Sequence, residues 1–279
     1  KGGIVLLEYP ELYTISEQMK HFLIGKTVQS GELHQANNNL FMSKADAENY
    51  KLLTGGTVTQ IDFDAPEVYV RLDNGYGILF CQCGGKILYH ENSSLMPDKH
   101  TIHFVFLDGS ALSYTMKLWS LGIFAMKQDD WESRKKKNLQ NRFQPLSNST
   151  EEDFIKFVQK IVGTDPLPVK TFLSKFVAGI MSSLAGDILL SARVHPSKKI
   201  NHLTEDEQRR IYKAMRKLLT VACEEGGRNT EFNLLGAKGN YAAMTERKNV
   251  GGPCPNCGNP LQKISVGGIT VYCPVCQVK

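Results

Sequence analysis

Four cysteines near the end of the chain have the spacing of a metal site. Cys254 and Cys257 form one Cys-x2-Cys pair, and Cys273 and Cys276 form a second pair after fifteen intervening residues. Two cysteines three positions apart on a tight turn direct both sulfur atoms to one point, so two such pairs can surround one ion with four thiolates. Because four thiolates leave no open coordination position, we expect one structural Zn²⁺ ion and no catalysis at the metal.

The segment between the two pairs is typical of a short β-hairpin. Residues 261–265 and 269–272 read as strands, and Gly267-Gly268 supplies the turn. So short a segment buries little apolar surface, so metal binding and folding should be one event. Disulfides or a redox pair are the competing interpretations. The odd total of seven cysteines, and our expectation that no secretory signal opens the chain, favour a reducing cytoplasm and therefore zinc.

Length, composition and charge limit the class of protein. The chain has 279 residues, of which 42% are hydrophobic, so we expect two domains and a small zinc module. No apolar run is long enough to suggest a membrane partner. The net charge of +5 is uneven, because residues 151–279 hold 18 Lys and Arg against 12 Asp and Glu, whereas residues 1–150 hold 15 against 16. A basic half next to a zinc module suggests a nucleic acid as partner, and an ordinary solvated charge excess is the alternative.

The first half of the chain reads as one helix followed by strands. Apolar residues recur at helical spacing over 10–24, with Pro10 in the first turn and Gly25 after the end. Many short β-branched or aromatic runs then alternate with turn residues, which predicts an antiparallel β-sandwich domain over residues 1–133. The expected strands cover 55–61, 67–72, 77–83, 86–89, 100–106, 111–116 and 122–126.

The second half changes to helical periodicity. A basic, polar stretch over 134–149 is typical of a linker, and a helical domain over 150–245 precedes the zinc finger of 246–279. Thr204 and Glu207 predict a capping box at the start of the last helix. The expected helices cover 151–162, 169–176, 183–193 and 204–224.

A glycine-containing connection, Val177-Ala178-Gly179, separates two of these helices. Such a two-turn connection exposes the free amide groups of a helix N-terminus, which can hold a phosphate. Plain packing of two helices explains the same pattern.

These features together resemble a known family. The opening Glu8-Tyr9-Pro10-Glu11-Leu12, the helix-two-turn-helix, the Val194-His195-Pro196 segment and the cysteine hairpin occur in the order of the formamidopyrimidine-DNA glycosylase / endonuclease VIII family. The resemblance implies an α+β multidomain fold and a bacterial, nucleoid-associated monomer. It also implies base excision repair, in which damaged double-stranded DNA is bound, an oxidised base is flipped out, and DNA glycosylase and AP lyase steps follow through a Schiff base.

The resemblance carries over only part of the family's catalytic set. Glu8 falls on the acid/base glutamate, but Leu7 falls on the nucleophilic N-terminal proline. Leucine offers only its α-amine, and only if Leu7 is the mature N-terminus. Lys1-Gly2-Gly3 is what a ribosome-binding site would encode, so we expect the natural start between residues 5 and 7. Pro66 falls on the position of the hairpin lysine.

The family's DNA-contacting positions are also mixed. Lys170 matches a basic position, while Ser182, after Gly179 in the two-turn motif, replaces an asparagine that grips phosphate. Arg228 lies in a loop, 226–230, which the resemblance places over the flipped base. Other replaced positions are Cys83 for a methionine that fills the void left by the base, Ile269 for the hairpin arginine, and the segment 114–122, which lacks an expected arginine.

Three functions are compatible with this sequence. Retention of Glu8 favours a DNA glycosylase with AP lyase activity. The loss of the nucleophile and of several DNA contacts favours a catalytically inactive protein that recognises damaged DNA. A zinc-stabilised protein that binds no DNA is the third possibility, which Ser182 and Ile269 support.

Overall fold

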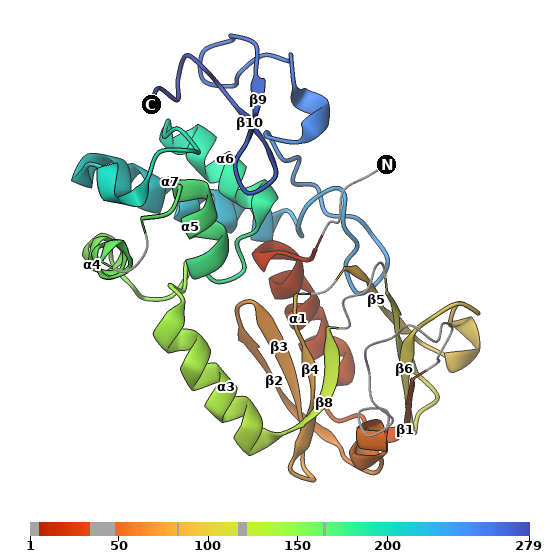
Figure 1. Cartoon of the computed structure of the whole chain (residues 1–279). Helices are drawn as coiled ribbons and strands as arrows, with labels where there is room; N and C mark the ends of the chain where they lie inside the picture. Colours follow the sequence, from red (N-terminus) through yellow and green to blue (C-terminus); the bar gives the residue numbers. More distant parts are fainter. Residues whose placement is uncertain (1–5, 34–47, 83, 117–121, 164–165) are drawn as a thin grey trace. The chain divides into compact units, whose positions relative to one another are not determined.

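The computed structural model describes residues 6–33, 48–82, 84–116, 122–163 and 166–279. The chain divides into two compact units. Unit 1 comprises residues 1–138 and 225–240, and unit 2 comprises residues 139–224 and 241–279. The α+β organisation expected from the sequence is confirmed (Figure 1).

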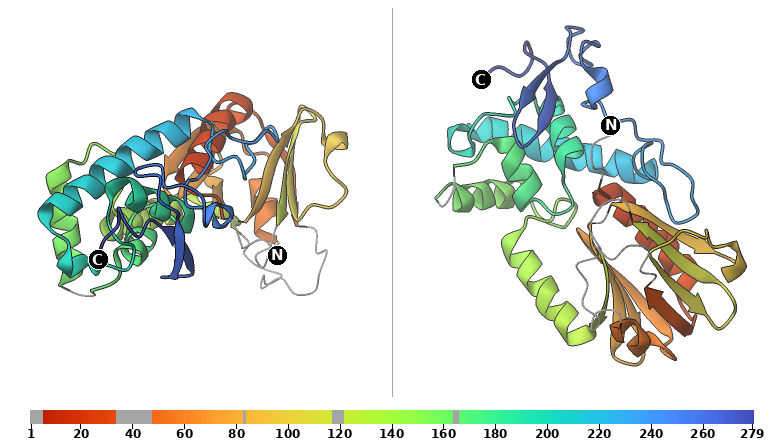
Figure 2. Two further views of the ribbon diagram at one scale, coloured as in Figure 1. Left: turned by 90° about the horizontal axis from the view of Figure 1, so that it is seen from above. Right: turned by 45° about the vertical axis from the view of Figure 1, so that its right-hand side comes forward.

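Unit 1 is a sandwich of two four-stranded antiparallel sheets with a leading helix, α1 (Figure 2). The strand orders are β1-β6-β7-β5 and β2-β3-β4-β8. Residues of α1 and of both sheets share one hydrophobic core, which includes Leu12, Val70 and Phe104. The elements of this half of the chain are α1 Tyr9–Leu23, β1 Val28–Leu33, the short helix η1 Tyr50–Leu53, β2 Val58–Asp64, β3 Glu67–Leu72, β4 Tyr76–Phe80, β5 Gly85–His90, the short helix η2 Ser93–Leu95, β6 Ile102–Phe106, β7 Ala111–Met116, β8 Ile123–Lys127 and α3 Gln128–Asn141.

Two elements of unit 1 differ from the expectation. The strand β1 was not anticipated, because its sequence, VQSGEL, is polar and contains a glycine. The first part of the expected linker 134–149 is helical, since α3 continues to Asn141. The expected position of Cys83 and most of the stretch 114–122 that lacks an arginine lie outside the described residues.

The helix α3 packs on the outer face of the second sheet through one aromatic side chain. Trp131 is fully buried, and its ring stacks on Tyr69 of β3 with centroids 5.0 Å apart and an interplanar angle of 17°. Arg134, one turn further along, donates from Nε to Glu67 Oε1 at 2.7 Å. The remaining residues of α3 are mostly polar, which explains why its sequence reads as a linker.

Unit 2 contains the helices and the cysteine hairpin. Thr204 caps α7, because its Oγ1 accepts from the N–H of Glu207 at 3.2 Å and its own N–H donates to Glu207 Oε2 at 2.9 Å. This capping box was predicted. The elements of unit 2 are α4 Glu151–Val162, α5 Val169–Phe176, α6 Ser182–Ala192, the short helix η3 Ile200–His202, α7 Glu205–Glu224, the short helix η4 Arg247–Asn249, β9 Gln262–Ser265 and β10 Ile269–Tyr272.

Membrane-spanning helices are absent from the described part of the chain, since no helix there is both long and apolar enough.

The contact of Trp131 with Tyr69 leads to a stability prediction. Trp131→Ala should lower the free energy of unfolding by about 3 to 5 kcal/mol, because it removes a buried aromatic ring and leaves a cavity. Urea denaturation followed by circular dichroism measures the effect. Lys136→Ala, an exposed change on the same helix, should stay within about 0.5 kcal/mol of the unchanged chain. Equal effects of the two substitutions would refute the packing of α3.

Candidate functional site

The carboxylate of Glu8 stands at the first turn of α1 in unit 1. Glu8 is the N-cap residue and has extended backbone angles, while Pro10 lies at the helix start. The N–H of Glu8 donates to Oε2 of Glu11 at 2.8 Å, which satisfies an amide group that a helix N-terminus otherwise leaves free. Both carboxylates are therefore set by the geometry of the first helical turn.

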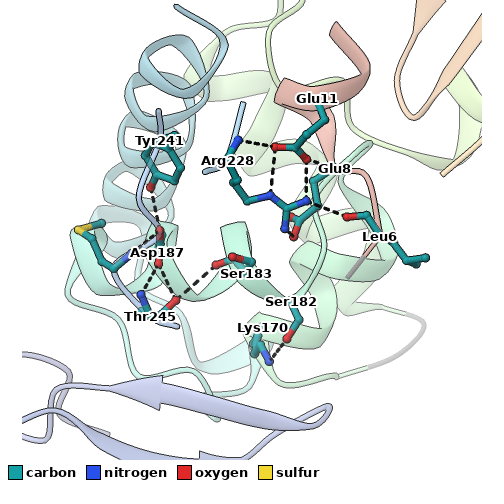
Figure 3. A network of polar contacts seen from close by, with 11 residues as sticks. Leu6, Glu8, Glu11, Lys170, Ser182, Ser183, Asp187, Arg228, Tyr241 and Thr245 are labelled. Carbon is teal, nitrogen blue, oxygen red and sulfur yellow. Dashed lines mark hydrogen bonds and ion pairs between the residues drawn. The ribbon is translucent and has the colours of Figure 1, made fainter. Parts of the chain in front are cut away.

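Arg228 connects these two carboxylates in one buried cluster (Figure 3). Its Nη1 donates to Glu8 Oε1 at 2.8 Å, and its Nη2 donates to Glu11 Oε2 at 2.6 Å and to the carbonyl oxygen of Leu6 at 2.7 Å. Glu11 Oε1 accepts from the backbone N–H and from Nε of Arg228, at 2.8 and 3.1 Å. The exposed fractions of Glu8, Glu11 and Arg228 are only 2%, 3% and 3%.

The charges of this cluster stabilise one another. Burial by itself lowers the pKa of the Arg228 guanidinium, but the attraction of Glu8 and Glu11 outweighs this effect and holds the pKa above its ordinary value. Arg228 therefore stays a cation and pairs with two carboxylates in the interior.

Arg228 reaches Glu8 from a closed loop, residues 225–240 of unit 1. The N–H of Asn240 donates to the carbonyl of Glu225 at 2.9 Å, which joins the ends of the loop. A Cβ atom on Gly239 would overlap the carbonyl oxygen of Gly227, so only glycine permits this close approach. Compact loops with joined ends are frequently functional.

The loop is also attached to the sandwich at its middle. The N–H of Leu234 donates to Gln18 Oε1 of α1 at 2.8 Å, and its carbonyl accepts from the N–H of Tyr89 of β5 at 2.8 Å. The resemblance placed Arg228 over a flipped base, whereas the structure directs its side chain inward to Glu8. Sequence reasoning missed this pair because the two residues are far apart in the chain.

The two positions at which the resemblance expects the nucleophile and a lysine, Leu7 and Pro66, carry no amine side chain. Leu7 is 1% exposed, and its side chain belongs to the core of unit 1. Pro66 lies in the turn between β2 and β3, where Glu67 is buried and paired with Arg134. The turn in which the resemblance expects a lysine therefore holds a proline, followed by a paired glutamate.

The two-turn connection of unit 2 is present as predicted. Gly179 has a φ of 73°, a left-handed conformation that favours glycine, between α5 and α6. Ser182 is the first residue of α6. Lys170 of α5 is 2% exposed and donates from Nζ to Ser182 Oγ at 2.8 Å (Figure 3).

Lys170 also contacts the cysteine hairpin within unit 2. Its Nζ donates to Thr270 Oγ1 at 2.7 Å and to the carbonyl oxygen of Val266 at 3.2 Å. Thr270 follows Ile269, and Ile269 is 47% exposed. Lys170 thus links the helix pair to the hairpin, a role that the sequence did not reveal.

A buried aspartate of α6 fixes the chain that leads to the hairpin. Asp187 accepts from the hydroxyl of Tyr241 at 2.7 Å, from the N–H of Met244 at 3.0 Å, and from the N–H of Thr245 at 2.7 Å. Burial raises the pKa of Asp187, although these donors oppose the shift. The Asp187 contacts are the second cluster drawn in Figure 3.

The four cysteines of the hairpin converge as predicted. All four sulfur atoms lie within 4.8 Å of one another, with 3.5 Å between Cys257 and Cys273 and 4.0 Å between Cys254 and Cys276. A tetrahedral zinc site with Zn–S bonds of about 2.3 Å places its sulfurs roughly 3.8 Å apart, so the cluster fits such an ion. The cluster could therefore bind a metal.

The surroundings of the cysteines act on their thiols in opposite directions, because burial raises the pKa of Cys254 and of Cys276. Hydrogen bonds from the side chain and backbone of Asn259 lower the pKa of the Cys257 thiol to about 6. Backbone N–H groups point at sulfur as well, from Asn256 to Cys254 at 3.4 Å and from Cys276 to Cys273 at 3.3 Å. Such donors stabilise the negative charge of metal-bound sulfur.

Comparisons with known proteins find similar chains. No family model matches the chain. Its sequence is 26% identical over 286 residues to a formamidopyrimidine-DNA glycosylase of Bacillus cereus (strain ATCC 10987 / NRS 248), covering 97% of this chain and 98% of that protein. A protein of the same name from Lactobacillus delbrueckii subsp. bulgaricus (strain ATCC 11842) is 27% identical over 282 residues, with the same coverage.

Solved structures share the fold. The MutM (Fpg) protein of Thermus thermophilus superposes with a TM-score of 0.80 at 23% identity, covering 97% of this chain and 98% of that chain. The Lactococcus lactis Fpg, solved with DNA that contains an abasic site, gives a TM-score of 0.83 at 24% identity, covering 98% of this chain and all of that chain. The chain therefore shares the fold of these solved structures and is similar, over almost its whole length, to proteins named formamidopyrimidine-DNA glycosylase, in line with the resemblance found in its sequence.

The buried ammonium of Lys170 gives a testable consequence. Lys170→Met should lower the stability of unit 2 by about 1 to 3 kcal/mol, because Ser182, Thr270 and Val266 lose a common donor in the interior. Urea denaturation measures the loss. Lys175→Met, an exposed change on the same helix, is the matched control. If both variants unfold at the same urea concentration, Lys170 does not hold the hairpin.

Proposed function

We propose that this chain is a DNA-repair protein that acts on double-stranded DNA containing oxidised bases or abasic sites. The main support is its sequence similarity, over almost the whole chain, to proteins named formamidopyrimidine-DNA glycosylase. The shared fold with the Lactococcus lactis Fpg, whose solved complex contains abasic-site DNA, supports it further. A protein with this role would work at the bacterial nucleoid.

DNA would bind unit 2 at the start of α6. The amide groups of this helix N-terminus follow Gly179, and Ser182 presents a hydroxyl there. Lys170 would add positive charge behind Ser182, through the hydrogen bond that joins them. We therefore propose Gly179 and Ser182 as phosphate contacts, with the buried Lys170 acting on the phosphate through Ser182, within a helical DNA-binding domain of residues 150–245.

The chemistry would depend on Glu8. A carboxylate at this position could handle protons during cleavage of the glycosidic bond, as the family resemblance implies. A Schiff base further requires a free amine, and Leu7 supplies one only if the mature chain begins there. Glycosylase and lyase activity therefore depend on different features of the same segment.

Borohydride trapping on abasic-site DNA tests this proposal. Two versions of the chain, one beginning at Lys1 and one beginning at Leu7, are compared with the same duplex. We expect a covalent adduct with the version that begins at Leu7, because only this version places an α-amine directly beside Glu8 to attack the sugar aldehyde. Replacing Glu8 by Gln in that version should reduce the yield.

DNA binding without an adduct would instead support a damaged-DNA-binding protein that has lost the chemistry. Binding should weaken as salt rises, because phosphate contacts release counterions. Binding that is undetectable, or that ignores salt, would contradict both forms of the proposal.

We also propose that the four cysteines hold one structural Zn²⁺ ion in a zinc finger of residues 246–279. The sulfur separations support this assignment. The ion would allow four neighbouring sulfurs to be thiolates together, which their mutual repulsion otherwise opposes. The bound ion would fix the hairpin that Lys170 contacts.

Metal content and removal test the zinc assignment. Dialysed protein should contain about one zinc per chain, and Cys254→Ser should lose the metal and expose the last residues to protease. Cys223→Ser, which changes a cysteine of α7 outside the cluster, serves as the control. A tail that stays protease-resistant after chelation would show that the metal is not needed.

A further inference from the structure

The space beside the Glu8 carboxylate is already filled. The Nη1 atom of Arg228 lies 2.8 Å from Glu8 Oε1, and both side chains are almost completely buried. A nucleotide that is turned toward Glu8 must bring its sugar to this carboxylate. A base still attached to that sugar would need additional room, and Arg228 takes part of the space around Glu8.

Displacing Arg228 would be costly. It would break hydrogen bonds to Glu8, to Glu11 and to the carbonyl oxygen of Leu6. Two buried carboxylates would then remain without their cation, which is a larger penalty than loss of an exposed ion pair. The loop that carries Arg228 is also closed at its ends and attached to α1 through Gln18. The arginine is therefore part of the resting site.

We propose that Arg228 is a specificity-determining residue that makes this site select abasic DNA over DNA carrying an oxidised base. This inference rests on the proposed function in damaged-DNA repair. An abasic sugar lacks the base, so it needs less room beside Glu8 while Arg228 stays in place. A flipped base reaches the same carboxylate only after the arginine has left.

The hydrogen bonds of Arg228 also suit an abasic sugar. The guanidinium has five N–H groups. The side-chain bonds to Glu8, Glu11 and Leu6 use four of them, and the second N–H of Nη1 makes no hydrogen bond to the described residues. A sugar oxygen beside Glu8 could accept from this group. Arg228 would then exclude a flipped base and bind an abasic sugar.

Competition between defined duplexes tests the proposal. Fluorescence anisotropy measures the Kd of the unchanged chain for three duplexes of one sequence: undamaged, with a tetrahydrofuran abasic analogue, and with 8-oxoguanine. We expect the abasic duplex to bind on the order of 100-fold more tightly than the 8-oxoguanine duplex, because only the latter must displace a buried ion pair. This comparison needs no variant.

Substitutions of Arg228 then test whether this residue causes the preference for abasic DNA. Arg228→Ser should bring the two lesion affinities within about tenfold of each other, and Arg228→Lys should reduce the preference partly, because lysine keeps the charge but not the fork of donors. Thr230→Ala, an exposed change in the same loop, should keep the full preference.

Each result separates the two proposals. Equal affinities of the unchanged chain for the abasic and 8-oxoguanine duplexes would overturn the role of Arg228 while leaving damaged-DNA binding intact. A preference that survives in folded Arg228→Ser would also overturn it. Affinities that are equal for damaged and undamaged DNA would overturn the proposed function itself.

Discussion

A buried arginine between two buried glutamates holds the start of the first helix in place. An isolated charge is unfavourable in the interior, because the free energy needed to remove it from water is larger than the free energy gained by packing its side chain. Arg228 meets Glu8 and Glu11 together, so the loop from 225 to 240, the first turn of α1 and the backbone at Leu6 form one structure. The candidate carboxylate is oriented by this ionic contact, in addition to its place on the helix.

In unit 2, buried charged side chains likewise join segments that are distant in the sequence, and here they hold the cysteine hairpin. Asp187 and Lys170 are both buried, and each binds groups from a segment that is distant in the sequence. Asp187 fixes the chain at Thr245 before the cysteine hairpin, and Lys170 fixes the hairpin at Thr270. The cysteine hairpin is therefore attached to the helices by polar contacts on two sides.

The sequence alone predicted those features of the fold that depend on interactions between residues close together in the chain. The capping box of Thr204 and Glu207, the cysteine pairs and the glycine turn of the hairpin all depend on residues a few positions apart. The helix α3 was missed because a single buried side chain, Trp131, attaches an otherwise polar segment to the sheet. The pairing of Arg228 with Glu8 was missed for a related reason. The two residues are 220 positions apart, and the local sequence around each of them does not depend on the other.

The joined ends of the 225–240 loop have a consequence for how such a protein could diversify. Because Asn240 bonds back to Glu225 and Gly239 lies against Gly227, the chain enters and leaves the loop at nearly the same point. Insertions or deletions between these ends need not shift the helix before the loop or the segment after it. The length and sequence of this loop can therefore change, and with them the ligand preference, without a change in the sandwich to which the loop is attached.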